Sequence, residues 1–294
     1  MVDIDKAELA KPTLSIDLPV HAGLKEFLTL LEKRLEDYCP VLAHGTYVEW
    51  CKQRLLRYPV VLPEYWQKSS PINPYCFMHS LFAELEERDI VVTGDGTACV
   101  ASFQVADLKK GQRLYTNSGC ASMGYDLPAA IGAHYASGRR VICLAGDGSI
   151  MMNLQELQTI AGFRLPIKLF ILNNDGYASI RQTQQNYFPD NIIGCGPESG
   201  VTFPDFVRLC DTFGIATNRW EKHEGMREAI HETLRGDAPQ ALEVMLDPQQ
   251  PFAPKLSSRK LDDGRMISAP LEDLFPFLPR EELAENMLVA LYEE

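Results

Sequence analysis

The sequence predicts an α/β fold, a doubly wound parallel sheet with helices on both faces, and two observations support it. Apolar runs of strand length, such as residues 141–145 and 167–172, alternate with amphipathic segments of helical length, such as residues 154–163. A Gly-Asp-Gly turn follows the first run directly, and an Asn-Asn pair follows the second. Because parallel strands point the same way, both turns are expected at one edge of the sheet, where such folds bind ligands.

The alternating pattern begins near Ile72 and continues to residue 250. Its expected elements, in order, are helix 75–87, strand 90–93, helix 123–137, strand 141–145, helix 154–163, strand 167–172, helix 203–213, helix 226–235 and strand 241–246. Strands that alternate with helices in this way form a parallel sheet that is covered on both faces.

The two flanks lack this alternation. A short strand at residues 2–5, an amphipathic helix at 21–36 and a proline-containing linker at 54–70 are expected before it. The segment after it is interrupted by prolines and ends in a short acidic helix at 281–293. We therefore divide the chain into residues 1–71, 72–250 and 251–294.

Composition excludes several functional classes. The 294 residues include 28 basic and 40 acidic ones, a balance that disfavours a nucleic-acid surface. No apolar run reaches the roughly 20 residues that cross a bilayer, and the first residues carry no apolar signal core, so we expect a cytoplasmic protein without a membrane partner. The eight cysteines form no CxxC pair, which favours reduced thiols over zinc ligands or disulfides.

The Gly-Asp-Gly turn has the features of a phosphate-binding turn. Gly146 and Gly148 allow the backbone to bend tightly and to approach a phosphate, and the amides around Ser149 can donate to its oxygens. A Gly-Asp-Gly turn by itself is more often only a polar turn after a strand. An earlier one, at residues 94–96, has no Asn pair at the same spacing, and we interpret it as a second phosphate-side loop rather than a second metal site.

The Asn pair adds metal-binding chemistry. It begins after 24 residues that follow the turn, a distance that one helix and one strand account for. Asp147 and Asn174 offer hard oxygen ligands that suit Mg²⁺ or Ca²⁺ better than Zn²⁺, and the carbonyl of Gly176 can complete the set. We therefore expect one metal ion that is shared with a bound diphosphate.

These motifs resemble the signature of the thiamine diphosphate-dependent family that contains acetolactate synthase and pyruvate decarboxylase. Residues 118–149, SGCASMGYDLPAAIGAHYASGRRVICLAGDGS, are similar to the acetolactate synthase segment that leads into the same turn, and the resemblance spans most of the region from Ile72 to about Leu246. It implies that Asp147, Asn174 and the Gly176 carbonyl hold Mg²⁺ and that Met123 supports the bent form of the cofactor. It also implies cofactor contacts at Gly96, Thr97, Ala98, Gly146, Gly148, Ser149, Asn174 and Gly176, with the backbone near Ala121 against the aminopyrimidine.

The resemblance covers roughly the second half of a family member. Members begin with a pyrimidine-binding domain whose glutamate activates the cofactor, and this chain has no room for that domain, so its own catalytic acid stays unknown. Residues 1–71 then correspond to a remnant of the middle domain, and FAD is not expected because most of that domain is missing. We expect either a separate pyrimidine-domain subunit or a missing N-terminal half, in an obligate oligomer.

The residues after the Asn pair bear on the substrate, which we expect to be a 2-keto acid. In the decarboxylases an acid stands six residues beyond the second Asn, and here that position is Ile180, which favours carboligation after decarboxylation. Arg181 can contact a substrate carboxylate, although a solvated helix arginine is at least as well supported.

Three alternatives remain at this point. The chain can be a simple 2-keto acid decarboxylase, or a non-catalytic cofactor-binding subunit or fragment. A nucleotide-binding module is disfavoured, because no P-loop lysine and no GxGxxG follows a strand.

Overall fold

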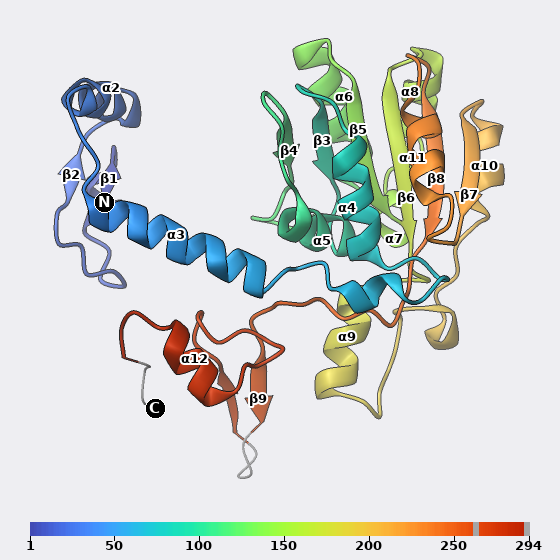
Figure 1. Ribbon diagram of the computed structural model, residues 1–294. Helices are drawn as coiled ribbons and strands as arrows, with labels where there is room; N and C mark the ends of the chain where they lie inside the picture. The colour runs from blue at the N-terminus through green and yellow to red at the C-terminus, as the bar shows by residue number, and fades with distance from the viewer. Residues whose placement is uncertain (261–264, 291–294) are drawn as a thin grey trace. The chain divides into compact units, whose positions relative to one another are not determined.

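The computed structural model describes residues 1–260 and 265–290 and divides the chain into two compact units, Met1–Pro59 and Val60–Glu294 (Figure 1). Each unit is described by itself. Within the described residues no helix is both long and apolar enough to cross a membrane. The eight cysteines are free, as the sequence predicted.

The first unit is small and mostly helical. Its strands β1 (Val2–Asp3) and β2 (Val20–His21) pair in parallel, and its helices are α1 (Lys6–Leu9), α2 (Leu24–Leu35) and α3 (Leu42–Arg57). Helix α2 lies inside the helix expected at 21–36, whereas α3 was not expected and takes up the first residues of the expected linker. No residue of α2 or α3 is buried within this unit.

The second unit contains the predicted parallel sheet. Among the described residues its six strands are β3 (Ile90–Thr93), β4 (Arg113–Tyr115), β5 (Val141–Gly146), β6 (Ile167–Asn173), β7 (Ala216–Trp220) and β8 (Gln240–Met245). They are all parallel, in the order β4-β3-β5-β6-β8-β7. The α/β fold class is confirmed.

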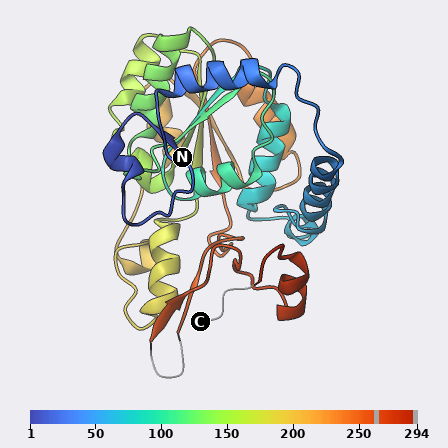
Figure 2. The ribbon, with the colours of Figure 1, turned by 90° about the vertical axis from the view of Figure 1, so that its left-hand side faces the viewer.

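Helices cover both faces of the sheet because alternate strand residues point to opposite faces. One face carries α4 (Pro74–Glu84), α5 (Thr97–Val105) and α11 (Met226–Leu234), and the other carries α6 (Asp126–Ser137), α8 (Glu156–Gly162) and α10 (Phe206–Thr212). Figure 2 shows these helices on both sides of the strands.

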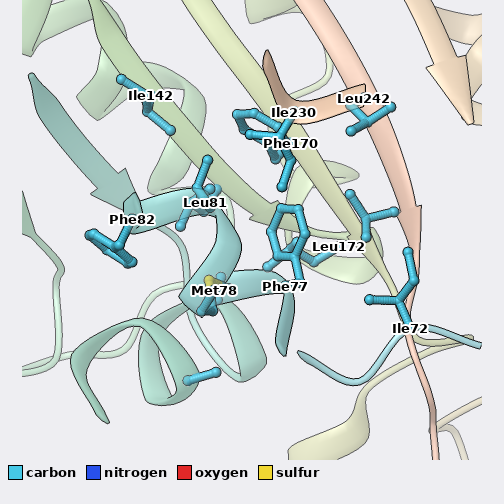
Figure 3. Close-up of a cluster of buried hydrophobic side chains, with 14 of the residues drawn as sticks. Ile72, Phe77, Met78, Leu81, Phe82, Ile142, Phe170, Leu172, Ile230 and Leu242 are labelled. Atoms are coloured by element: carbon cyan, nitrogen blue, oxygen red, sulfur yellow. The ribbon is translucent and has the colours of Figure 1, made fainter. Parts of the chain in front are cut away.

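The first of these faces packs as a continuous apolar cluster. Phe170 of β6 meets Phe77 of α4 with 5.7 Å between ring centroids, and Ile142, Leu242 and Ile230 surround them (Figure 3). All five side chains are 0–1% exposed, and burial of each contributes about 1.5–3 kcal/mol to folding. This core fixes the strands whose ends carry the polar turns.

Several boundaries differ from the prediction. Strands β4 and β7 and helices α5 and α9 (Ala178–Tyr187) were not among the expected elements. The edge strands are short and partly exposed, so they lack the apolar run that marks the central ones. Helix α6 begins at Asp126 rather than Met123, because Gly124 turns the chain with φ +78°. Helix α8 begins two residues later than expected, and α10 begins three residues later, where the Asp205 side chain caps it.

The segment after β8 is irregular. Strands β9 (Ser258–Lys260) and β10 (Met266–Ser268) form an antiparallel pair, and α12 spans Arg280–Asn286. The acidic helix expected at 281–293 was therefore too long: residues 287–290 are not helical, and the last part of that expectation lies outside the described residues. Short helical turns complete the unit at η1 (Pro63–Trp66), α7 (Asp147–Ile150) and η2 (Pro197–Ser199).

The strand order creates a crevice beside the polar turns. The chain leaves β3 toward β4 on one side, whereas it leaves β5 toward β6 on the other. Loops at the carboxyl ends of β3 and β5 therefore diverge, which is the arrangement in which open α/β sheets bind ligands. Figure 1 shows α7 and α9, the helices that follow β5 and β6, below the sheet.

Candidate functional site

Three loops meet at the carboxyl edge of the sheet: those after β3, β5 and β6. Together with the turn before α6 they form the cleft, our name for the pocket at this edge. The cleft is lined by Asp95, Gly96, Thr97, Met123, Gly146, Asp147, Gly148, Ser149, Asn174, Gly176, Tyr177, Ala178, Ser179 and Ile180. The structure thus brings together most residues that the sequence assigned to the site.

Asp147 is the buried carboxyl of the cleft lining, and it is only 2% exposed. Its Oδ1 accepts a hydrogen bond from the Gly148 amide at 2.7 Å, and its Oδ2 accepts one from the Gly176 amide at 2.9 Å. Burial raises the pKa of this carboxyl to about 6, although the amides of Gly176, Gly148 and Asn174 act against the shift. A nearby cation would favour the ionised form of such a buried carboxylate.

Asn174 contributes an unsatisfied oxygen. Its Nδ2 donates to Thr97 Oγ1 at 2.9 Å, so Thr97 fixes the orientation of the amide. The Oδ1 of the same side chain is buried and has no hydrogen-bond partner among the described residues. Because buried polar atoms are nearly always paired, this oxygen fits a missing partner, and an oxygen ligand beside a carboxylate suits Mg²⁺ or Ca²⁺.

Two glycines of the cleft allow close approaches of the backbone. A Cβ at Gly148 would lie 2.1 Å from Cε1 of Tyr177, so any side chain there would displace the ring. Gly176 has φ +128°, and a Cβ there would lie 2.1 Å from the backbone oxygen of Cys195. The positions of the turn after β5 and of the loop after β6 therefore depend on glycine.

The remaining predicted residues are divided between the cleft and its surroundings. Gly96, with φ +63°, precedes α5, and Met123 and Ile180 line the cleft with side chains 39% and 42% exposed. Ala98 is fully buried against the first face of the sheet, and Ala121 is exposed with φ +50° in the turn before Met123. Neither alanine lines the cleft.

Arg181 also lies outside the cleft lining. Its Nη1 donates to the Asn174 carbonyl at 3.3 Å, and its Nη2 donates to the carbonyls of Asp175 and of Cys195, the latter at 3.4 Å. The guanidinium therefore contacts the backbone of the loop that carries Asn174.

Sequence reasoning missed Asp126, which lies behind the cleft. Its Oδ2 accepts from the Ser149 hydroxyl at 2.6 Å, and that hydroxyl accepts from the Gly124 amide at 2.9 Å. A Cβ at Gly94 would lie 2.5 Å from Asp126 Oδ2, so three loops of the site meet at this carboxyl. Burial raises its pKa. The one signal in the sequence was an acidic residue within an apolar block. An acidic residue there is equally expected at the exposed start of a helix.

Comparison with known proteins gives a consistent result. The family model described as thiamine pyrophosphate enzyme, C-terminal TPP binding domain, matches residues 94–244, a span that contains every residue that lines the cleft. Thiamine pyrophosphate and thiamine diphosphate are the same cofactor.

Curated relatives are similar over most of this chain. The acetolactate synthase large subunit of Pyropia yezoensis is 31% identical over 274 residues, which are 90% of this chain and 44% of that protein. Acetolactate synthase 1, chloroplastic, of Zea mays is 29% identical over 269 residues, 87% of this chain and 41% of that protein. The acetolactate synthase isozyme 1 large subunit of Escherichia coli (strain K12) is 26% identical over 265 residues, which are 86% of this chain and 43% of that protein.

The chain thus spans less than half the length of these relatives. The family match covers about half of the chain and includes the loops that end β3, β5 and β6. On these grounds the chain belongs to the thiamine pyrophosphate enzyme family and contains the C-terminal cofactor-binding domain of that family.

Proposed function

We propose that the chain is the diphosphate-holding half of a thiamine diphosphate- and Mg²⁺-dependent enzyme that decarboxylates a 2-keto acid and joins the product to an acceptor carbonyl. The observation that carries the proposal is the unpaired, buried Oδ1 of Asn174 beside the buried carboxyl of Asp147. A divalent cation would satisfy both groups at once, because it would pair the orphaned oxygen and compensate the buried charge.

The residues of the cleft then have distinct tasks. Asp147, Asn174 and the Gly176 carbonyl would hold Mg²⁺, and the turns at Gly96 and Gly148 would approach the diphosphate. Bound thiamine diphosphate supplies the carbon nucleophile and the electron sink for decarboxylation. The contribution of this chain is position and electrostatics, with an apolar contact from Met123 to support the bent cofactor.

Ile180 supports carboligation over simple decarboxylation. It lines the cleft with an apolar side chain, so it offers no proton at a position where an acid would assist aldehyde release. Replacing it with glutamate should raise the ratio of aldehyde to ligated product, measured by chromatography in the assembled enzyme. An unchanged ratio would remove this argument and leave simple decarboxylation equally supported.

The curated relatives support a second chain or segment. They are named as acetolactate synthase large subunits or acetolactate synthases, and this chain spans less than half of each. We infer that a pyrimidine-binding domain, as a separate subunit or an N-terminal half, completes the site in an oligomer. FAD is not part of the proposal.

Calorimetric titration tests the cofactor assignment without knowledge of the substrate. The full chain should bind thiamine diphosphate with Mg²⁺, lose binding with EDTA, and lose it in Asp147→Ala. Excess ATP, at constant free Mg²⁺, should not compete with thiamine diphosphate for the chain. Binding that is insensitive to EDTA and to Asp147→Ala would overturn the metal assignment, and competition by ATP would favour a nucleotide-binding module.

Hydrogen–deuterium exchange at C2 of the bound cofactor tests whether the chain is only half of a site. We expect exchange at the free-cofactor rate when the chain is alone, because the residue that activates the cofactor is proposed to lie on the partner domain. Faster exchange in the chain alone would contradict that proposal. Exchange that stays slow even with a pyrimidine-domain partner would indicate a non-catalytic cofactor-binding subunit.

A further inference from the structure

The loop that carries two of the three proposed Mg²⁺ ligands is held by one side chain of the following helix. Asn174 and Gly176 lie between β6 and α9, and Arg181 projects from α9 back onto this loop. Sequence reasoning left open whether Arg181 contacts a substrate carboxylate. Its contacts in the structure favour a different role.

The guanidinium of Arg181 contacts three backbone carbonyls. Two of them, at Asn174 and Asp175, belong to the loop after β6, and the third, at Cys195, belongs to a neighbouring loop. Within the described residues no carboxylate pairs with this guanidinium, so its charge is placed against carbonyl dipoles. The planar fork of arginine suits this task, since it holds several donors in fixed directions.

Each of the two loops has a glycine close to this guanidinium. A Cβ at Gly196 would lie 2.8 Å from Arg181 Nη2, and one at Gly176 would lie 3.0 Å from the same nitrogen. The Tyr177 amide donates to the Cys195 carbonyl at 2.8 Å. The half-buried guanidinium therefore lies between the two loops.

The neighbouring loop is itself anchored to α9. Gln184, three residues after Arg181, donates to the Ile193 carbonyl at 2.9 Å and accepts from its amide at 2.8 Å. The Ser199 hydroxyl accepts from the amides of Cys195 and Gly196 at 2.9 and 3.0 Å. Arg181 thus connects the loop after β6 to a neighbouring loop that Gln184 and Ser199 already hold in place.

We propose that Arg181 is a positioning residue for the metal-binding loop and not a substrate contact. It fixes the backbone of residues 174–176, so that Asn174 and Gly176 present their oxygens to Mg²⁺ without further ordering. This inference rests on the proposed function. Groups that orient metal ligands typically change metal affinity by about 10–100-fold when they are removed.

The test is the Mg²⁺ affinity of the full chain at saturating thiamine diphosphate, measured by calorimetry. Arg181→Gln should raise the Kd for Mg²⁺ by about 10–100-fold. Arg181→Lys should raise it less, because an ammonium can satisfy some of the three carbonyls. In a separate titration at excess Mg²⁺, both variants should bind thiamine diphosphate with the affinity of the wild type. Arg208→Gln, at an exposed arginine of α10, is the matched control for lost charge and should leave the Kd unchanged.

Each result has a distinct meaning. An unchanged Mg²⁺ Kd in Arg181→Gln, with the wild-type chain binding normally, would overturn the positioning role and favour the substrate contact. Where Arg181→Gln fails to fold, a wild-type Kd in Arg181→Lys would overturn the role equally. A wild-type chain that binds no Mg²⁺ with thiamine diphosphate would overturn the proposed function, and this assignment with it.

Discussion

Asp126 is a carboxyl that is fully buried beneath the cleft and contacts no basic side chain among the described residues. Its two oxygens accept from the Ser149 hydroxyl and the Leu127 amide, yet desolvation dominates and raises its pKa. Ionisation of this group in the folded state therefore opposes folding. The polar contacts of Asp126 join the loops of the site, but the burial of its carboxyl lowers the free energy of unfolding.

Asp126→Asn should reveal that cost as a pH dependence. An acid whose pKa is raised on folding contributes stability that is present in full below its unfolded pKa of about 4 and is lost as pH rises through its folded pKa. The free energy of unfolding of the wild type should therefore fall relative to that of the variant as the pH rises above about 4. Urea titrations of both proteins at each pH would measure it.

Asp107→Asn is the control for this experiment, because Asp107 is exposed. The difference in the free energy of unfolding between the wild type and Asp107→Asn should not change comparably with pH. A constant difference between the wild type and Asp126→Asn across the pH range would contradict the raised pKa.

Gly176 has a backbone conformation that no other residue adopts easily. With φ +128° and a Cβ position 2.1 Å from the Cys195 oxygen, alanine would strain the loop and displace a neighbouring carbonyl. We expect Gly176→Ala to lower the free energy of unfolding by about 2–3 kcal/mol. Urea denaturation measures the loss.

Gly132, in the interior of α6, is the matched control. A Cβ there meets nothing within 4 Å, and its φ is not positive. Because glycine is a poor helix former, Gly132→Ala should raise the free energy of unfolding by about 0.5–1 kcal/mol. Similar losses in both variants would mean that the loop is not strained.

At the scale of elements, the amino ends of β3 and β5 are joined by an ion pair. Arg140, just before β5, contacts Asp89, just before β3, with Nε to Oδ1 at 2.9 Å and Nη2 to Oδ2 at 2.5 Å. Asp89 is 5% exposed, and β3 and β5 are the two strands whose carboxyl ends flank the crevice. The pair therefore fixes the two strands at the end opposite the site.

Arg140→Met should lower the free energy of unfolding by about 3 kcal/mol, since it leaves the buried Asp89 carboxylate without a cationic partner. The Arg140→Met/Asp89→Asn double variant should recover part of that loss, because the uncompensated charge is gone. A double-mutant cycle by urea denaturation measures the coupling. Additive losses from the two substitutions would mean that the pair contributes nothing as a pair.

The elements that the sequence predicted are those whose signal is local. Strands β5 and β6 are apolar runs buried on both faces, and α11 has a clear amphipathic pattern, so each was predicted near its observed place. Strands β4 and β7 are edge strands with one neighbour each, and no apolar run marks them in the sequence. They pair with β3 and β8, so their formation depends on the central strands of the sheet.

At the scale of the whole molecule, the division into two compact units predicts independent folding of the second. Val60, Val61 and Tyr65 pack against the core of that unit, so a cut before Val60 preserves it. We expect residues 60–294 to unfold cooperatively and to bind thiamine diphosphate and Mg²⁺ as the full chain does. Calorimetry of unfolding and of binding measures both.

The first unit should behave differently. Its two longer helices bury no residue within the unit, so residues 1–59 alone should show no cooperative unfolding transition. Loss of cooperative unfolding in residues 60–294 would contradict the division. A cooperative unfolding transition in residues 1–59 alone would contradict the expectation for the first unit.

The sequence by itself determined the α/β class, the central strands and the two turns of the cleft, because these depend on local apolar runs and on a spacing of 24 residues. The tertiary structure decided the strand order, with β8 between β6 and β7, and it placed Arg181 on backbone carbonyls and Asp126 behind the cleft. Those features depend on which distant segments meet in space. Local periodicity carries no information about such long-range contacts.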